Sequence, residues 1–334
     1  MTRRRAFLVL SVLALCAPGA CRERTPAATA GSPPAALFPV LVKGKTGFID
    51  QRGAVAIAPT FDESPGFAEG LAPVRQGERW GFIDHSGAWA ITAQFDFASS
   101  FSEGLAAAEL GESFGFIDRS GRWVVSPRFA AAGDFHDGRA RVLRSGHWGF
   151  ADARGQLAVA AQFDEAYDFA EGLAAVRSGS LWSYVDITGR VVIPARFKET
   201  YRFSEGLAWV FVDPQMAYID RTGRIVIDHP EYFEEGIFSE GLASVRVGGK
   251  IGFIDRTGRL VVPARFDLTS IFREGTAPVS VNGKWGFVGR DGGLVIPCRF
   301  DLAQPFSGGL AAVNVGRQLG YIDTRGTFVW KPQQ

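Results

Sequence analysis

Apolar and polar residues alternate over most of this chain, in short runs separated by glycine, aspartate and proline. Runs such as LAAVRS (173–178) and RLVVP (259–263) place successive side chains on opposite faces, which is typical of β-strands. Strands such as IGFID (251–255) end in D-x-x-G, where the aspartate can accept hydrogen bonds from the turn backbone and the glycine takes a positive φ. The pattern therefore predicts short antiparallel strands joined by tight turns, which is an all-β fold.

The strand that ends at this turn occurs nine times, from TGFID (46–50) to LGYID (319–323). Successive copies are 34 residues apart, with one spacing of 35. A fixed spacing indicates a repeat array, and the frequent glycine and proline argue against helical repeats of this period. Every copy has Phe or Tyr at one position, including Phe116 and Phe253, and we expect these side chains to be core residues. A unit of three strands is too small to be stable alone, so neighbouring repeats must bury each other's aromatic side chains.

The repeated unit resembles the bacterial WG repeat, which is named for a Trp-Gly pair in its signature strand. The pair is present at Trp80-Gly81, Trp148-Gly149 and Trp285-Gly286, together with G-F-I-D, V-V-I-P and F-x-E-G-L-A. The resemblance extends over residues 37–330. It implies an all-β repeat protein, often found in the bacterial envelope, and it implies no established activity.

The two ends of the array bear on whether it is open or closed. The chain enters the array at FPVLV (38–42) and leaves it after TFVW (327–330). Both ends already carry the strands of a full unit, so neither end supplies a strand that the other lacks. We therefore expect nine antiparallel β-meander units in an open or spiral solenoid, with a closed, propeller-like toroid as the alternative.

The N-terminal segment MTRRRAFLVLSVLALCAPGAC has three arginines, then an apolar run, then small residues before a cysteine. This pattern predicts a signal peptide over residues 1–20 and resembles a lipobox, which implies a lipid anchor on Cys21. Cleavage near Ala20 or Ala30 without a lipid is the alternative, and export by the general or the twin-arginine route is left open. We expect an exported protein of the bacterial cell envelope that is held to a membrane.

Composition defines the remaining segments and excludes one class of partner. Residues 21–36 are rich in Pro, Ala and Thr and predict a flexible tether before the repeat domain at 37–330 and the tail at 331–334. Removing residues 1–20 takes away three arginines and no acid, which changes the formal net charge from +1 to −2. Such a charge gives no support for nucleic-acid binding. Cys298 replaces an alanine of sister repeats, so we expect a small buried side chain there.

The titratable residues do not form a recognisable reaction centre. The repeated acids occur singly, each beside a turn glycine, whereas calcium loops place several oxygen ligands in one short segment. The histidines lack partners at metal-ligand spacing; they are His85, His136, His147 and His229. We expect structural turn roles for the acids, no metal or cofactor, and no catalytic residues.

The candidate binding residues lie where the repeat becomes irregular, over residues 181–235. In the strand LAWVFV (207–212), Trp209 replaces a small residue and Phe211 replaces the arginine of sister strands. Large aromatic side chains on a face that reaches water suggest a binding platform, to which Tyr201, Tyr232 and Phe233 could contribute. The alternative is that these aromatic residues pack against one another to accommodate the irregular repeats.

These observations favour a non-enzymatic, envelope-anchored scaffold that presents a β surface to another envelope protein or to cell-wall glycan. The alternatives are a hydrolase of envelope polymers and a passive structural subunit of a larger assembly. A hydrolase needs one asymmetric constellation of catalytic groups, for which such a regular chain offers few unique residues.

Overall fold

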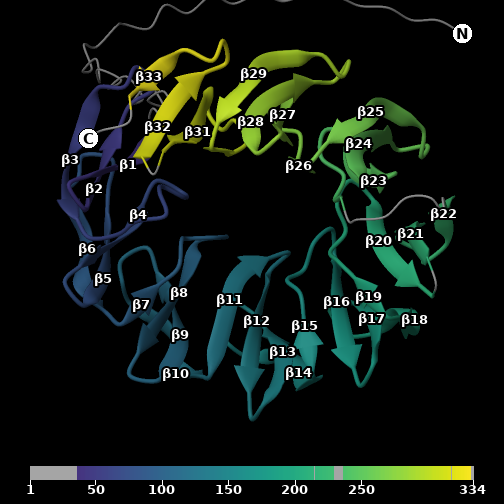
Figure 1. The fold of residues 1–334 in the computed structure, drawn as a ribbon. Coiled ribbons are helices and arrows are strands. Elements are labelled where there is room, and N and C mark those ends of the chain that lie inside the picture. Colours follow the sequence, from purple (N-terminus) through teal and green to yellow (C-terminus); the bar gives the residue numbers. More distant parts are fainter. Residues whose placement is uncertain (1–35, 214, 229–235, 317, 332–334) are drawn as a thin grey trace, which may run out of the picture. The chain divides into compact units, whose positions relative to one another are not determined.

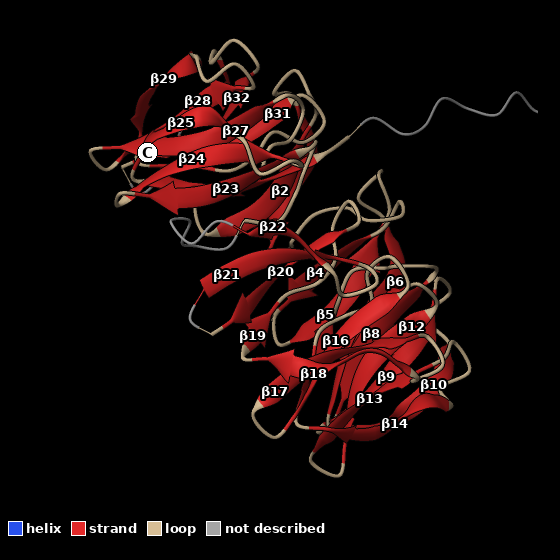
Figure 2. Cartoon of the chain, turned by 90° about the vertical axis from the view of Figure 1, so that its right-hand side faces the viewer, coloured by secondary structure: helices blue, strands red, loops and turns tan. Residues whose placement is uncertain are grey.

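The computed structural model describes residues 36–213, 215–228, 236–316 and 318–331. Within these residues the chain forms nine antiparallel sheets, one for each repeat, which we call blades 1 to 9 in chain order. The blades follow one another around a central opening, and the last lies beside the first (Figure 1). In a second view the described residues form only strands and loops (Figure 2).

Blade 1 contains β1 (Phe38–Val42), β2 (Lys45–Ile49) and β3 (Val55–Phe61), blade 2 contains β4 (Ala72–Gln76), β5 (Arg79–Ile83) and β6 (Trp89–Phe95), and blade 3 contains β7 (Phe97–Ala98), β8 (Leu105–Leu110), β9 (Ser113–Asp118) and β10 (Trp123–Phe129). Blade 4 contains β11 (Ala131–His136), β12 (Arg139–Arg144), β13 (His147–Ala151) and β14 (Leu157–Phe163), and blade 5 contains β15 (Glu165–Ala166), β16 (Leu173–Ser178), β17 (Leu181–Asp186) and β18 (Val191–Phe197).

Blade 6 contains β19 (Glu199–Thr200), β20 (Leu207–Val212), β21 (Gln215–Asp220) and β22 (Ile225–Asp228), and blade 7 contains β23 (Leu242–Val247), β24 (Lys250–Asp255) and β25 (Leu260–Phe266). Blade 8 contains β26 (Leu268–Thr269), β27 (Thr276–Val281), β28 (Lys284–Gly289) and β29 (Leu294–Phe300), and blade 9 contains β30 (Leu302–Ala303), β31 (Leu310–Val315), β32 (Gln318–Asp323) and β33 (Phe328–Trp330).

Each blade is a meander in which the LAAV-type strand lies on the side of the central opening and the VVIP-type strand lies at the rim (Figure 1). In six blades a further strand pairs with the inner side of the LAAV-type strand; these are β7, β11, β15, β19, β26 and β30. The glycine of the signature strand permits this geometry. At Gly252 an added Cβ would lie 2.4 Å from the carbonyl oxygen of Val262 on the neighbouring strand. The pairing of β24 with β25 shifts register on either side of Phe253. The glycine of the Trp-Gly pair therefore marks a close approach of two strands, and blades 5 and 6 have Ser183 and Ala217 at this position.

The core lies between the blades and is built from the repeated aromatic residues. Phe116 and Phe253 are 0% and 1% exposed, which confirms that they are core residues. Phe116 contacts Phe135 of the next repeat with ring centroids 4.8 Å apart, and Phe253 contacts Phe272 at the same distance. Cys298 is partly buried against the cluster shared by blades 7 and 8. Each blade thus completes the core of its neighbour.

The repeated acids hold turns and connect blades. Asp118 accepts hydrogen bonds from the backbone amides of Ser120 at 2.9 Å and Arg122 at 3.1 Å. The acid of the E-G turn reaches the next repeat, because Glu69 accepts a hydrogen bond from the Gly104 amide at 3.0 Å. The same link recurs along the chain from Glu103, Asp137, Glu171, Glu205, Glu240 and Glu274.

The expectation of an open or spiral array is wrong, because blade 9 packs against blade 1. Phe38 and Tyr321 lie with ring centroids 5.6 Å apart, and the Tyr321 hydroxyl donates to the carbonyl oxygen of Pro39 at 2.8 Å. The Gln51 side-chain amide donates to the carbonyl oxygen of Gly308 at 2.9 Å. The equivalent contact elsewhere in the ring is made by the Arg119 side chain, which donates to the carbonyl oxygen of Glu69. Side-chain packing closes the ring, so no exchange of strands between the termini is needed.

Three departures from the repeat pattern are explained by this closure. The segment before blade 1 reads SPPAAL, so the phenylalanine that F-x-E-G supplies to the other blades is missing there. Phe38 stands where the sister strands have alanine, and its ring packs in a cluster with Leu310 and Tyr321. Gly308 replaces the acid of the other turns, and a Cβ there would lie 3.3 Å from atoms of Ala36 and Phe38. The irregular residues are those that join the two ends.

Among the residues that the structure describes, none belongs to a helix with the length and apolar character required to cross a bilayer.

Candidate binding site

The candidate residues of the irregular region come together at the inner edge of blade 6. Tyr201 follows the short strand β19, and Trp209 and Phe211 lie on β20 beside it. Tyr201 and Phe211 are partly exposed, whereas Trp209 is only 6% exposed. Tyr232 and Phe233 lie outside the described residues. Three of the five candidates are thus close neighbours on one blade.

The open face expected for Trp209 is not present, because the LAAV-type strand is covered on both sides by neighbouring blades. Trp209 packs with Tyr218 of its own blade and with Phe238 and Val245 of the next. In sister strands its position is occupied by smaller residues, among them Pro73, Ala107, Ala175 and Ser244. The charged residue two positions later in those strands, arginine in three and Glu109 in the fourth, shows only that the end of this face reaches water.

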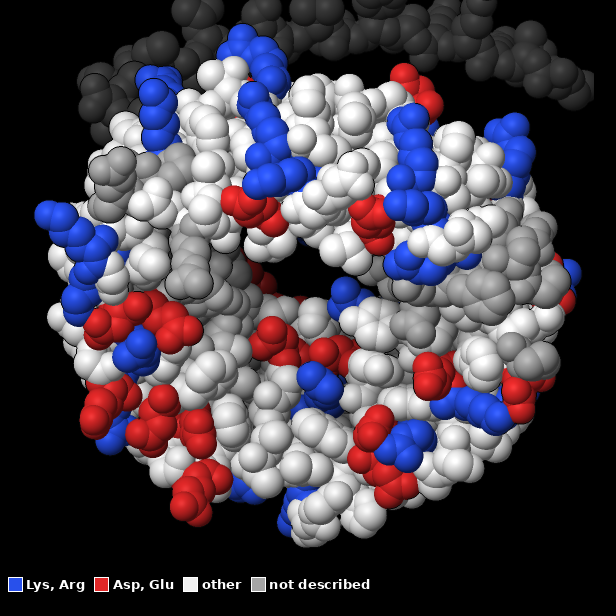
Figure 3. All heavy atoms as spheres, viewed as in Figure 1, with Lys and Arg blue, Asp and Glu red and all other residues white. Residues whose placement is uncertain are grey.

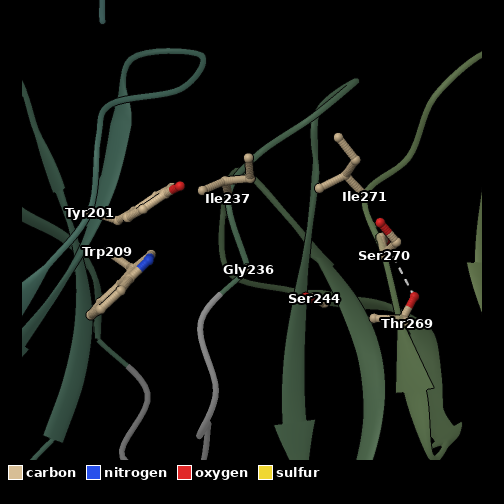
Figure 4. A pocket seen from close by; sticks show the side chains of 8 residues that line it. All are labelled: Tyr201, Trp209, Gly236, Ile237, Ser244, Thr269, Ser270 and Ile271. Carbon is tan, nitrogen blue, oxygen red and sulfur yellow. Dashed lines mark hydrogen bonds between the residues drawn. The ribbon is translucent and has the colours of Figure 1, made fainter. Parts of the chain in front are cut away.

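A pocket of about 300 Å³ lies among blades 6, 7 and 8 beside Trp209 (Figure 4). It is lined by Tyr201, Trp209, Gly236, Ile237, Ser244, Thr269, Ser270 and Ile271. In Figure 4 the two aromatic rings form one side, and Thr269 and Ser270 lie on the opposite side. Gly236 packs closely against β23, because a Cβ there would lie 2.4 Å from backbone atoms of Ser244.

A second pocket, of about 510 Å³, lies between blades 5 and 6 on the other side of Tyr201. It is lined by Glu165, Tyr167, Arg177, Ser180, Trp182, Lys198, Glu199, Thr200, Tyr201 and Trp209. Tyr201 and Trp209 line both pockets, so the inner edge of blade 6 separates them. We call the two pockets and this edge the aromatic crease.

Aromatic packing continues from blade 5 to blade 6 along the aromatic crease. Tyr167 stacks on Trp182 with centroids 5.1 Å apart and planes 18° apart, and it meets Tyr201 edge-on at 4.9 Å. The guanidinium of Arg177 lies 5.9 Å from the centre of the Trp182 ring, and that of Arg202 lies 5.7 Å from the centre of the Tyr201 ring. These contacts orient the aromatic side chains.

Two buried tyrosine hydroxyls fix the backbone of the aromatic crease. The Tyr184 hydroxyl donates to the carbonyl oxygen of Tyr201 at 2.8 Å and also contacts the Thr200 hydroxyl. The Tyr218 hydroxyl donates to the carbonyl oxygen of Gly236 at 2.6 Å. Burial raises the pKa of Tyr184 far above its ordinary value, so this phenol keeps its proton and remains a donor. The crease therefore rests on anchored segments.

Sequence reasoning missed most of these residues. Tyr167, Trp182 and Ser244 line the pockets, and Tyr184 and Tyr218 position them. One signal was available in the sequence. The aromatic position of the repeat is Phe in six copies and Tyr in three, and two of those tyrosines lie in the irregular region. A Phe-to-Tyr change in a core column indicates that a buried carbonyl group needs a donor.

The charges around the aromatic crease neutralise one another. Arg177 forms an ion pair with Glu165, and Lys198 forms one with Asp213 at 2.5 Å. Glu199 lies beside Lys198, and Arg202 covers the ring of Tyr201. On the face shown in Figure 3, acidic and basic side chains both occur around the central opening. Within the described ranges, no three His, Cys, Asp or Glu side chains are placed to hold a metal ion together.

One solved structure superposes well on the ring of blades. A structure described as the eukaryotic initiation factor is 11% identical and superposes with a TM-score of 0.63 over 88% of this chain and 95% of that one. Apo AztD from Citrobacter koseri is 13% identical and gives a TM-score of 0.44 over 89% and 93%. A comparison with curated proteins gave no match. At 11% identity the likeness to the initiation factor structure concerns the fold alone, which is a closed β-propeller.

Family membership rests on the repeats themselves. The family described as WG containing repeat matches residues 47–80, 80–112, 114–146, 148–182, 182–213, 216–250, 251–285 and 285–317. These eight segments cover most of the blades, including the irregular repeats that lack the Trp-Gly pair. The chain therefore belongs to the WG-containing repeat family and folds as a β-propeller.

Proposed function

We propose that this protein is a non-enzymatic binding scaffold and that the aromatic crease of blades 5 to 8 is its ligand-binding site. One observation carries the proposal: two pockets flank Tyr201 where the repeat departs from its regular pattern. Stacking between blades requires only small residues at the position of Trp209, as Ala175 illustrates. Concave sites with an aromatic lining and a few polar groups are typical of ligand binding.

The proposed location is the bacterial cell envelope, with a lipid on Cys21 as the membrane anchor. The support is the N-terminal sequence, in which arginines and an apolar run precede Gly-Ala-Cys. Residues 22–36 would then be the tether between the lipid and the propeller. Partners within reach would be other envelope proteins and cell-wall glycan.

Capture from an envelope extract tests the binding site. The full chain with Tyr201→Ala should lose its partners, because this side chain lines both pockets. The matched control is Gln304→Ala, which changes the corresponding position of blade 9, away from the crease. Equal capture by both variants would place the binding site elsewhere on the ring. Chemical change of a captured molecule would show that the protein is an enzyme.

Anchoring is tested separately. Cys21→Ser should move the protein from the membrane fraction to the soluble fraction and abolish incorporation of labelled fatty acid. A variant that stays with the membrane, beside a wild type that incorporates no label, would contradict the lipid anchor.

A further inference from the structure

Resting on the proposed function, we propose that the ligand of the aromatic crease is an uncharged glycan chain of at least two sugar units. The chain would lie across Tyr201 with one unit in each pocket. Three features of the crease carry this inference: its division into two adjoining pockets, its pairing of aromatic rings with hydroxyl groups, and its balanced charge.

The division into two pockets favours an extended ligand. The pockets measure about 300 and 510 Å³, and Tyr201 and Trp209 line both. Each volume is typical of a pocket that binds a small molecule. A compact ligand would fill one pocket and leave the other empty. A chain with a flexible link between rigid rings can enter both pockets and cross the edge of blade 6 between them.

The pairing of rings with hydroxyls matches the two kinds of surface on a sugar. A sugar ring has a face of C–H groups that can pack on an aromatic ring and a periphery of hydroxyls that need partners. Tyr201 and Trp209 supply the aromatic side, and Ser244 and Ser270 supply hydroxyls in the same pocket. Within the described residues, no side-chain hydrogen bond engages either serine hydroxyl, whereas Thr269 donates to the carbonyl oxygen of Pro278 at 2.8 Å. The serines therefore remain available to a ligand.

The neighbouring glycine makes this pocket specific to blade 7. Gly236 occupies the position that Tyr201 holds in blade 6 and Tyr167 holds in blade 5. A side chain there would collide with the Ser244 backbone, so this position carries no ring like those of Tyr167 and Tyr201. The Tyr218 hydroxyl holds the Gly236 carbonyl at 2.6 Å, which keeps this segment in place. The pocket is thus preformed before a ligand arrives.

The balance of charge argues for an uncharged chain. Glu165 pairs with Arg177, and Lys198 pairs with Asp213. Glu199 and Arg202 add one charge of each sign. A polyanion or polycation would require an excess of the opposite charge, and its binding would weaken steeply with salt. For an uncharged glycan we expect little dependence on salt.

The test is calorimetric titration of the purified full chain with defined sugars. The probes are tetrasaccharides of N-acetylglucosamine, glucose and mannose, the three corresponding monosaccharides, a heparin tetrasaccharide and a chitosan tetrasaccharide. At least one uncharged tetrasaccharide should bind about tenfold or more tightly than its monosaccharide, because only the longer probe reaches both pockets. Raising the salt from about 50 to about 500 mM should change its affinity less than about twofold.

Variants locate the binding. Tyr201→Ala should weaken the tetrasaccharide about tenfold or more, and Ser244→Ala should weaken it several-fold. Gln304→Ala should leave its affinity unchanged. Thermal unfolding of each variant checks that Tyr201→Ala is folded, and Tyr201→Phe, which keeps the ring, should retain most of the affinity.

The outcomes separate this inference from the proposed function. If no uncharged tetrasaccharide binds, or only the charged probes bind, the glycan inference is wrong. If an envelope protein is then captured through Tyr201, the binding scaffold still stands. If neither sugar nor protein binding depends on Tyr201, both proposals fail.

Discussion

Replacing Phe38 with alanine restores the residue that every sister strand has at this position, yet it should destabilise the protein. Phe38 is 8% exposed and packs against Tyr321 across the junction of blades 1 and 9. Truncation of a buried phenylalanine to alanine costs about 3–5 kcal/mol, because the lost contacts leave a cavity. The aromatic contact with Tyr321 accounts for about 0.5–1.5 kcal/mol of this. In sister blades the phenylalanine of F-x-E-G fills the equivalent space.

The assay is equilibrium unfolding in guanidinium chloride, followed by tryptophan fluorescence and far-ultraviolet circular dichroism. In the closed ring each blade has two neighbours, so we expect the wild type to unfold in one transition with coincident probes. Phe38→Ala should lower the midpoint and separate the two probes, because blades beside the opened junction lose one neighbour and unfold first. Leu41→Ala, at a 55% exposed side chain on the same strand, is the control and should have little effect.

A second variant sharpens this prediction. Gly308→Glu makes the last E-G turn match the others, where acids adopt φ of 49–55°. The φ of Gly308 is +60°, so the backbone tolerates the change, but the new Cβ would lie 3.3 Å from atoms of Ala36 and Phe38. We therefore expect destabilisation, whereas an open array would be unaffected or stabilised. If Phe38→Ala behaves like Leu41→Ala and Gly308→Glu is stabilising, the account of closure is refuted.

Trp209→Ala should lower the free energy of unfolding by about 3–5 kcal/mol, because the side chain is only 6% exposed. Phe211→Arg should lower it by less than about 1 kcal/mol. Equal denaturation midpoints for the two variants would contradict this. Burial raises the pKa of Tyr321 from 10.0 to about 12. As the pH rises, the phenol therefore ionises in the unfolded state before it ionises in the folded state, and the free energy of unfolding should fall between pH 10 and about pH 12. Tyr321→Phe should flatten that fall in urea titrations. Hydrogen bonding to Ser120 lowers the pKa of Asp118 to about 2 from 3.8, so its stabilising contribution should disappear as pH falls through this range, and Asp118→Asn should remove that dependence.

Much of the local structure could be predicted from the sequence. The alternation in RLVVP and the turn in D-x-x-G correspond to strand β25 and to the hydrogen bonds made by Asp118. The aromatic position of the repeat was expected in the core, and Phe116 and Phe253 are buried there. These features depend on contacts within one repeat or between adjacent repeats, and nine copies of the pattern make them readable.

The candidate site was predictable only in part. The irregular region was recognised from Trp209 and Phe211. The pockets lie on either side of Tyr201 and Trp209, which are neighbours on blade 6. The exposure of Trp209 was misjudged, because alternation along a strand separates two faces without revealing what covers each face. In a propeller the neighbouring blades cover both faces of the strand that carries Trp209, so its side chain is buried.

The sequence by itself determined the repeat, its strands and turns, and the need for neighbouring repeats to share a core. Only the tertiary structure decided that the array closes. Closure depends on the rotation from each blade to the next. Packing at every interface sets this rotation, and the rotations add up around the ring. The residues that make the closing contacts are Phe38, Gly308 and Tyr321, which are far apart in the sequence and meet across one junction. Read within single repeats these residues are irregularities, and they become the closing contacts only when the first and last blades lie side by side.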